Sequence, residues 1–317
     1  MAERTARSEA PEPGGVVLEW LLDSDPSIRW QVLRDLTGEP PEVVAAERAR
    51  VASEGWGARL LDLQAADGQW GGGVYFPYWT ATTDTLALLR ELGVDPDCDR
   101  ARRAAGLVRD RVTWGEEFGD APFFEGEVEP CINGRVLALG AYFGEPSDRL
   151  VDRLLGEQLD DGGWNCEAPA SKRSSFHSTI CVLEGLLEYE KARGPATAVA
   201  DASARGREYL LERGLFRRRS TGAVIDADWA RFSFPTRWAY DVLRGLDYLR
   251  AAGVEPDRRI AEAVALVVRK RDDSGRWPLE NPHPGEVHFA MEAADEPSRW
   301  NTLRALRVLD WASDGAW

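Results

Sequence analysis

The chain has 317 residues, of which 44% are hydrophobic, enough for the core of one large domain or two ordinary ones. Its 54 acidic and 39 basic side chains give a formal net charge of −15, and a field of that sign repels phosphate backbones, so nucleic acid is excluded as a partner. No apolar run approaches the roughly 20 residues needed to cross a bilayer, which argues against a transmembrane segment.

The beginning of the chain differs in composition from the rest. Residues 1–14 are polar, rich in Pro and Glu, and lack the apolar stretch of a signal peptide, so we interpret them as a disordered lead. No linker divides residues 15–317, which we expect to form a single domain. The four cysteines, without a secretion signal, indicate reduced thiols and a cytoplasmic protein.

Three segments share one pattern, and each follows an amphipathic helical stretch. Residues 64–70 read Gln-Ala-Ala-Asp-Gly-Gln-Trp, and residues 158–164 read Gln-Leu-Asp-Asp-Gly-Gly-Trp. Residues 271–277 keep the Gly and the Trp but place Arg where the Gln stood. Gly favours a tight turn, Gln supplies a donor and an acceptor to unsatisfied helix ends, and Trp adds a large buried surface. Recurrence of this pattern predicts a helical repeat.

A second element, Pro followed by Ser or Thr and then an apolar periodic run, begins at Pro26, Pro235 and Pro297. It is a helix-start signal. Together the two elements predict six inner helices, about 45–62 residues apart, each paired with a more charged outer helix. The predicted inner helices span residues 27–37, 79–92, 131–143, 176–190, 236–250 and 298–311.

The Gln-x-x-Asp-Gly-x-Trp element resembles the QW motif of squalene-hopene and oxidosqualene cyclases. In that family the Gln caps helix ends and the Trp packs beside it, so that an outer helix is tied to the next inner one. The resemblance implies an all-α fold, an α/α toroid of about six helical hairpins, shared by terpenoid cyclases and the β-subunits of protein prenyltransferases.

In a toroid the N-termini of the inner helices meet at one mouth of the central cavity. The loops that enter these helices are rich in aromatic residues, whose faces stabilise carbocations or simply fill the ring. We therefore expect a hydrophobic or isoprenoid small molecule as the ligand. The expected substrate-binding residues are Tyr75, Phe76, Trp79, Phe123, Phe124, Phe176, Phe234 and Trp238.

Possible metal ligands stand at two neighbouring helix starts. Protein prenyltransferase β-subunits hold zinc with an Asp-x-Cys at one inner-helix start and a His at the next, and this chain resembles them there. The resemblance implies that Cys131 and His177 bind Zn²⁺ and that Glu129 replaces the aspartate as ligand or catalytic carboxylate. Cys166, on the loop before His177, is a further soft ligand, and the set suits an open, catalytic zinc site. The alternative is that these cysteines only pack in the core.

Each family's other signature is missing. The Arg and Lys that bind diphosphate in prenyltransferases correspond to Phe123 and Gly126 here. Lys172 and Arg173, just before His177, either replace them in part or belong to a solvated basic loop. Of the Asp-x-Asp-Asp acid motif of class II cyclases only Asp84 remains.

Three hypotheses follow. The first is a zinc-dependent enzyme acting on an isoprenoid or similar molecule in the toroid cavity, by transfer, cyclisation or hydrolysis. The second is a non-catalytic toroid that binds a hydrophobic ligand or a protein. The third is a cyclase that uses Asp84 without a metal.

Overall fold

A computed structural model describes residues 14–116 and 120–313, and the regular secondary structure over these residues is almost entirely helical. The predicted lead, residues 1–14, lies outside the described residues except for Gly14. The α-helices are α1 (Gly15–Leu22), α2 (Pro26–Asp35), α3 (Pro41–Ala49), α4 (Gly55–Asp62), α5 (Thr82–Leu92), α6 (Asp99–Arg111), α7 (Pro130–Tyr142), α8 (Asp148–Gly156), α9 (Phe176–Arg193), α10 (Thr197–Leu211), α11 (Val242–Ala251), α12 (Ala261–Arg269) and α13 (Arg299–Ser313). Short 3-10 helices are η1 (Arg50–Ala52), η3 (Phe123–Glu125), η4 (Ala227–Ala230) and η5 (Arg258–Ile260). Strands β1 (Trp277–Pro278) and β2 (Pro297–Ser298) form one antiparallel pair.

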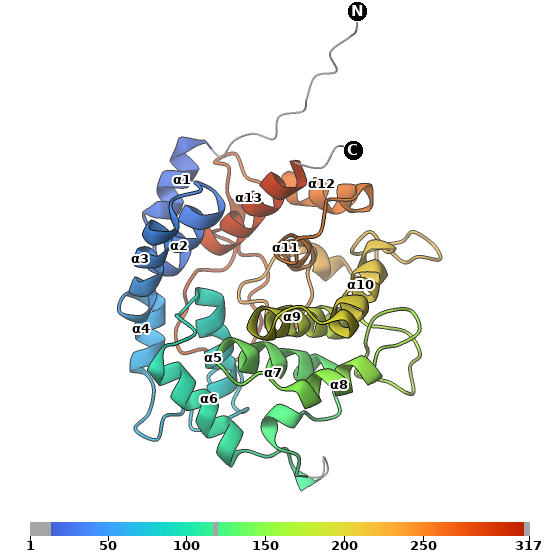
Figure 1. Ribbon diagram of the computed structural model, residues 1–317. Helices are drawn as coiled ribbons and strands as arrows, with labels where there is room; N and C mark the ends of the chain where they lie inside the picture. Colours follow the sequence, from blue (N-terminus) through green and yellow to red (C-terminus); the bar gives the residue numbers. More distant parts are fainter. Residues whose placement is uncertain (1–13, 117–119, 314–317) are drawn as a thin grey trace, which may run out of the picture.

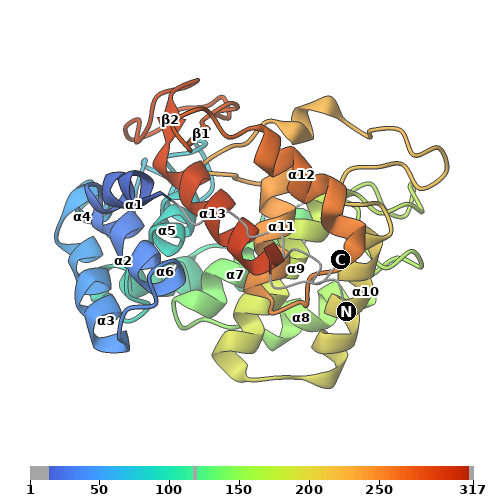
Figure 2. The same cartoon turned by 90° about the horizontal axis from the view of Figure 1, so that it is seen from above.

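The helices form a closed double ring (Figures 1 and 2). Going round the inner ring, α5 packs on α7, α7 on α9, α9 on α11, α11 on α13 and α13 on α2. The ring closes where α2 meets α5, because Trp30 Nε1 donates a hydrogen bond to the Leu92 carbonyl at 3.0 Å. The outer helices α4, α6, α8, α10 and α12 follow one another outside this ring, and α1 packs on α2. The predicted all-α toroid of about six hairpins is therefore confirmed.

The three repeated turns make equivalent contacts. Trp70, Trp164 and Trp277 are each fully buried, and each donates its indole N–H at 2.7 Å to a carbonyl at the end of the preceding outer helix, namely that of Leu60, Leu154 or Val267. The backbone N–H of each Trp donates to a threonine hydroxyl in the next inner helix, namely Thr82, Thr179 or Thr302, at 3.0–3.1 Å. Each turn thus ties an outer helix to the inner helix that follows, which leads the chain round the ring.

The first two turns also use their glutamines alike. Gln64 Nε2 donates to the Gly68 carbonyl at 2.9 Å, and Gln158 Nε2 donates to the Gly162 carbonyl at 2.6 Å. The turn glycines have φ values of 88° and 95°, and Gly275 of the third turn has 83°. Side chains with a Cβ rarely adopt this left-handed conformation, which explains why all three turns keep the glycine.

The pair α7 and α9 has the closest backbone approach among the inner helices. A Cβ on Gly134 would overlap the Cys181 carbonyl, and one on Gly185 would overlap the Gly134 carbonyl. Two glycines therefore let these helices touch through their backbones, and this contact brings the beginnings of both helices together.

Two predicted helix boundaries are wrong. The helix predicted at 236–250 begins at Val242, since Arg237 has a left-handed φ of 56° and Asp241 caps the helix by accepting a hydrogen bond from the Arg244 N–H at 2.7 Å. The helix predicted at 79–92 begins at Thr82. Both corrections lengthen the loops that enter the inner ring. Among the described helices none is both long and apolar enough to cross a bilayer.

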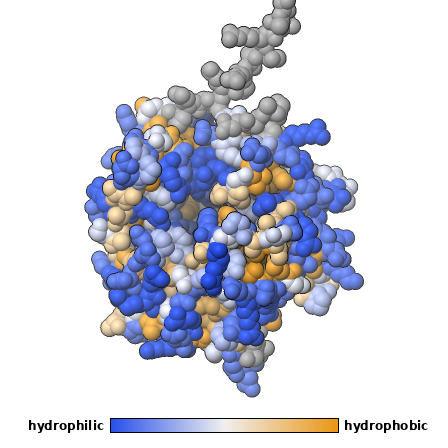
Figure 3. Space-filling model, in the orientation of Figure 1, coloured by the Kyte–Doolittle hydropathy of each residue, from blue (hydrophilic) through white to orange (hydrophobic). Residues whose placement is uncertain are grey.

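Hydrophilic residues cover most of the face seen in Figure 3, and the apolar residues there form small separate patches. The apolar surface is instead buried between the two rings, where a continuous core runs through all the hairpins.

Candidate functional site

Three metal-ligating side chains meet where α7 begins. Cys131 stands in the first turn of α7, Glu129 is the residue that precedes the helix, and Cys166 comes from the loop after Trp164. The Sγ atoms of the two cysteines lie 2.8 Å apart, and Cys131 Sγ is 3.5 Å from Glu129 Oε2. One donor atom from each of the three lies within 4.8 Å of the others. We call Glu129, Cys131 and Cys166 the metal-ligand cluster.

The pKa values of the two cysteines in the cluster are set mainly by the contact between their thiols. The contact between the thiols lowers the pKa of Cys166 and raises that of Cys131, because the thiolate of one accepts a hydrogen bond from the thiol of the other. The hydroxyl of Ser178, 3.2 Å from Cys166 Sγ, adds to the effect on Cys166. The cluster is thus prepared to present one thiolate, the form in which cysteine binds metal.

A buried carboxyl group that the sequence reasoning missed lies two residues before the cluster. Glu127 is 3% exposed, and its Oε1 accepts a hydrogen bond from the Glu129 N–H at 2.9 Å. The Asn133 side chain holds this segment, accepting from the Glu127 N–H and donating to its carbonyl. Burial raises the pKa of Glu127 to about 7, a value suited to general acid or base catalysis. The sequence signal for Glu127 is the Glu-Val-Glu stretch immediately before the Pro-Cys helix start.

His177 does not join the cluster, although it was predicted as a ligand. Its Nδ1 accepts a hydrogen bond from the Tyr240 N–H at 2.8 Å, and its ring packs edge-on against Trp229 and Trp238. Burial, with a smaller contribution from Arg244, lowers the pKa of His177 to about 4. The neighbouring residue on α9, Ser178, is the one that faces Cys166. One residue turns an α-helix by about 100°, so two adjacent residues cannot both face the cluster.

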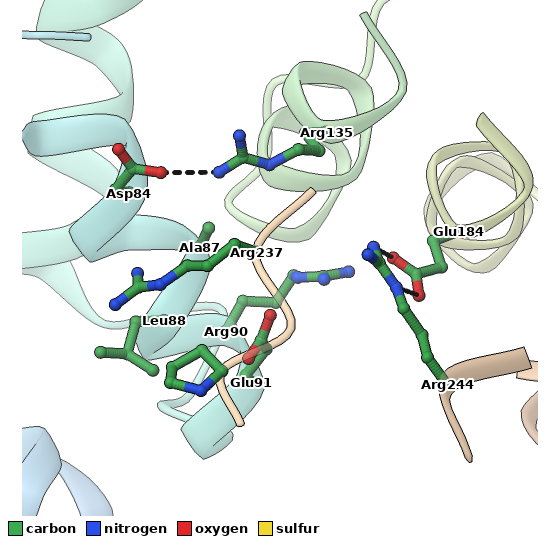
Figure 4. A pocket seen from close by; sticks show the side chains of 10 residues that line it. Asp84, Ala87, Leu88, Arg90, Glu91, Arg135, Glu184, Arg237 and Arg244 are labelled. Carbon is green, nitrogen blue, oxygen red and sulfur yellow. Dashed lines mark hydrogen bonds and ion pairs between the residues drawn. The ribbon is translucent and has the colours of Figure 1, made fainter. Parts of the chain in front are cut away.

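The centre of the ring holds a small charged cavity of about 20 Å³, room for a water molecule rather than for a hydrocarbon. Two ion pairs cross it (Figure 4): Arg135 with Asp84 at 2.6 Å, and Arg244 with Glu184 at 2.7 Å. Although burial opposes it, the Arg244 guanidinium holds the pKa of Glu184 below its usual range. The charged lining residues are Asp84, Arg90, Glu91, Arg135, Glu184, Arg237 and Arg244. We call this space the central cavity, and its charged lining differs from the cavity for a hydrophobic ligand that was expected from the sequence.

The metal-ligand cluster and the central cavity lie along the same helix faces. Cys131 and Arg135 are four residues apart on α7, which places them one above the other on one face. Cys181 on α9, the helix packed against α7, also borders the central cavity, since its Sγ lies 3.8 Å from Arg244 Nη2. The cluster therefore stands at the α7 and α9 end of the charged cavity.

A second, larger pocket of about 170 Å³ opens beside the central cavity, and we call it the loop pocket. It is walled by the loop that enters α5, the loop that enters α11 and the loop 282–292. Leu88, Pro235 and Arg237 line both spaces. Its other lining includes Trp79, Phe234, Leu279, His283, Val287, His288, Phe289, Met291 and Glu292.

The predicted substrate-binding aromatics divide into three groups. Trp79 and Phe234 line the loop pocket, and Phe234 stacks on Trp300 with ring centroids 4.0 Å apart. Phe123, Phe124 and Phe176 are buried core residues. Phe76 and Trp238 lie at the surface, 62% and 46% exposed, and Tyr75 is half-buried against the core.

Lys172 and Arg173 are exposed and line neither cavity described above. Arginines from α5, α7 and the loop before α11 occupy the centre instead. The sequence signal for the charged residues of the central cavity was a charge inside an otherwise apolar inner helix, as with Arg135 and Glu184.

No protein-family model matches the chain, and no curated protein matches it. Among solved structures, it is similar to a protein from Actinoplanes, with 19% identity, coverage of 91% of this chain and 90% of that chain, and a TM-score of 0.45. It is also similar to the type II terpene cyclase MstE from Scytonema in its apo form, with 16% identity, 91% and 87% coverage, and a TM-score of 0.46. A variant of MstE in complex with geranylgeranyl dihydroxybenzoate, its substrate, gives 16% identity, 91% and 86% coverage, and a TM-score of 0.45. Likenesses this distant do not carry an activity to this chain.

Proposed function

We propose that this protein is a zinc-dependent enzyme whose metal is bound by Cys131, Cys166 and Glu129, and which acts on an isoprenoid or another small molecule with an apolar body. The observation that supports it is the meeting of two thiols and a carboxylate at the beginning of α7. Two of these residues are 35 positions apart in the chain. Their proximity is produced by the fold and not by a local turn.

The donor set fits zinc. Zinc binds cysteine sulfur and carboxylate oxygen, and three protein ligands with one open position are characteristic of its catalytic sites. Two soft thiolates disfavour magnesium and calcium, which require oxygen ligands. The Ser178 hydroxyl beside Cys166 is a second layer of support, of the kind that orients metal ligands.

The chemistry is divided between the metal and the chain. Bound zinc would polarise a substrate group or lower the pKa of a coordinated nucleophile. Glu127, with its pKa of about 7, is placed to hold or release a proton beside Glu129. Arg135, one helical turn beyond Cys131, offers a positive charge toward an anionic part of the substrate, and its ion pair with Asp84 fixes its direction.

The ion pair also bears on the metal-independent alternative. A cyclase that protonates an alkene needs a neutral carboxylic acid held by other carboxyl groups. Asp84 Oδ1 instead accepts a hydrogen bond from the Arg135 guanidinium at 2.6 Å. This contact favours a structural and positioning part for Asp84 over the part of proton donor.

The proposal is tested by the metal content of the protein purified under reducing conditions without chelators. About one equivalent of zinc is expected in the wild type. Cys131→Ala and Cys166→Ala should lose it, while Cys98→Ala, a matched cysteine at the beginning of α6, should keep it. A wild-type protein that takes up no zinc even when the metal is added, or a Cys131→Ala variant that keeps it, would contradict the proposal.

The substrate class is tested separately, by native mass spectrometry for a small molecule retained by the protein and released on unfolding. An isoprenoid or another apolar compound is expected. A zinc-bound protein that carries and turns over only polar metabolites would retain the metal part of the proposal and refute the substrate part.

A further inference from the structure

The loop pocket combines an apolar wall with a guanidinium that makes no hydrogen bond or ion pair to the described residues. Trp79 and Phe234 supply aromatic faces, and Met291 and Val287 supply aliphatic surface. Arg237 enters between them from the loop before α11. In Figure 4 its guanidinium points away from the Glu184–Arg244 pair and toward Leu88, which lines the loop pocket as well as the central cavity.

The guanidinium of Arg237 makes no hydrogen bond or ion pair with any residue in the described part of the chain. Its contact is with the Trp79 ring, whose centroid lies 4.9 Å from Cζ. Burial lowers the pKa of Arg237 to about 10, and Asp84 and Glu91 offset part of this effect from a distance. An arginine taken out of water normally finds a carboxylate or phosphate for its five N–H donors. Arg237 therefore has unused binding capacity.

A second unsatisfied group lines the same pocket. His283 Nε2 is buried without a hydrogen-bond partner among the residues described. His288, in contrast, is engaged, since its Nε2 lies 2.9 Å from the Thr85 hydroxyl. The pocket's carboxylate is engaged too, because Glu292 accepts from the Ser298 hydroxyl and from the Arg299 N–H at 2.5 and 2.6 Å. The polar groups left open to a ligand are thus a cation and an imidazole, not an acid.

The pocket wall is fixed by backbone contacts. Trp79 Nε1 donates to the Pro284 carbonyl at 2.9 Å, and the backbone N–H of Trp79 donates to the Glu286 carbonyl at 2.6 Å. A Cβ on Gly285 would overlap the Trp79 indole nitrogen. The indole therefore holds the loop 282–292 against the ring with one face left beside Arg237, so the pocket is largely formed before any ligand enters.

We infer that the loop pocket is a binding site for a small amphiphilic anion, whose oxyanion contacts Arg237 and His283 and whose apolar body lies against Trp79 and Phe234. A carboxylate and a phosphate ester share the chemistry that would fit. The site is separate from the metal-ligand cluster, and none of the three cluster residues lines it. Its occupancy does not depend on the proposed zinc.

The inference is tested by titration calorimetry with four eight-carbon probes, octanoate, octyl phosphate, octanol and octylammonium, on zinc-loaded and chelator-treated protein. Octanoate or octyl phosphate should bind saturably and equally to both preparations, and the tighter of the two identifies the headgroup. Octanol and octylammonium should bind at least about tenfold more weakly, the ratio expected when a charge-assisted hydrogen bond is lost.

Variants separate the anion contact from a general effect on folding. Arg237→Gln should weaken the better anion about 10- to 100-fold and leave octanol unchanged, and Arg237→Lys should restore part of the loss. Arg218→Gln removes the same charge from an exposed position and should change nothing. Equal binding of octanoate and octanol, undiminished anion binding by Arg237→Gln, or no saturable binding of any probe at millimolar concentration would each overturn the inference. Because the metal is varied independently, such a failure leaves the zinc proposal standing, and the reverse also holds.

Discussion

The metal-ligand cluster and the loop pocket lie on one ring but are assembled from different kinds of structure. The cluster stands at the beginning of α7 and on the loop before α9, and the backbones of α7 and α9 touch through Gly134 and Gly185. The loop pocket is walled by three loops, and its central contact joins Trp79 to Pro284 across 205 residues of sequence. The first site is therefore as rigid as the helix pair that carries it, whereas the second depends on a few contacts between loops.

The strongest way to break this comparison is to separate α7 from α9. In Gly134→Ala the new methyl group meets the Cys181 carbonyl, so the helices must move apart, and we expect the free energy of unfolding to fall by about 3 kcal/mol. Gly156→Ala at the end of α8 is the matched control, since a Cβ there meets nothing within 4 Å. It should be neutral or stabilising by up to about 1 kcal/mol. Urea unfolding measures both, and equal effects would show that the backbone contact is unimportant.

Zinc provides the next largest expected effect and acts on the cluster alone. At a free zinc concentration about 100 times its Kd, the wild type should gain about 2.7 kcal/mol in its free energy of unfolding, because the metal binds the folded state. Cys131→Ser should gain nothing, and Cys98→Ser should gain as much as the wild type. Thermal unfolding with and without zinc measures the difference. A stabilisation that survives Cys131→Ser would place the metal elsewhere.

The sequence predicted the part of this architecture that is encoded locally. The three Gly-Trp turns and the inner helices were recognisable because periodicity, left-handed glycines and buried tryptophans recur at similar spacing. The beginning of α11 was misplaced, since its Pro-Thr signal marks a loop and the capping side chain of Asp241 decides where the helix begins. A single capping residue is a weaker sequence signal than a periodic pattern of apolar residues.

The candidate sites were also predicted only in part. Cys131 and Cys166 were expected together because Cys131 begins one inner helix and Cys166 lies on the loop that enters the next, and they lie together. His177 was expected with them but faces the loop before α11, because sequence proximity does not fix the side of a helix. Arg237 gave no signal at all. Its importance comes from the absence of a partner, which only the folded structure reveals.

His177 stands on α9 and accepts a hydrogen bond from the Tyr240 N–H in the loop before α11, and its charge state should reveal how strongly its packing stabilises the fold. Its folded pKa of about 4 lies below the ordinary value of about 6.5, so the neutral ring stabilises the fold above pH 6.5 and this contribution is lost as the pH falls toward 4. The loss should be on the order of 2 kcal/mol, less than the difference between the two pKa values alone would give, because the half-buried ring is partly solvated. The groups that interact with it are Arg244, Asp226 and His283.

His177→Asn keeps an acceptor for the Tyr240 N–H but removes the titration. The free energy of unfolding of this variant, measured from pH 7 to pH 4, should fall less steeply than that of the wild type. Lys172→Gln, an exposed change nearby, should follow the wild-type curve. Superimposable curves for His177→Asn and the wild type would mean that the ring is protonated in the fold without penalty.

The smallest expected effect on stability isolates the loop pocket. Gly285 has a φ of 140° and lies against the Trp79 indole, so Gly285→Ala must displace the loop or the ring. Because only loop contacts are lost, the free energy of unfolding should fall by only about 1 kcal/mol, while octanoate binding weakens clearly. Gly222→Ala is the matched control, with a left-handed φ of 71° but open space around it, and it should carry the backbone strain without affecting the ligand. If both variants bind octanoate as the wild type does, the Trp79 face does not shape the pocket. If Gly285→Ala also lowers zinc binding, the two regions are coupled, and the contrast drawn between a rigid helix-borne site and an independent loop-borne site must be given up.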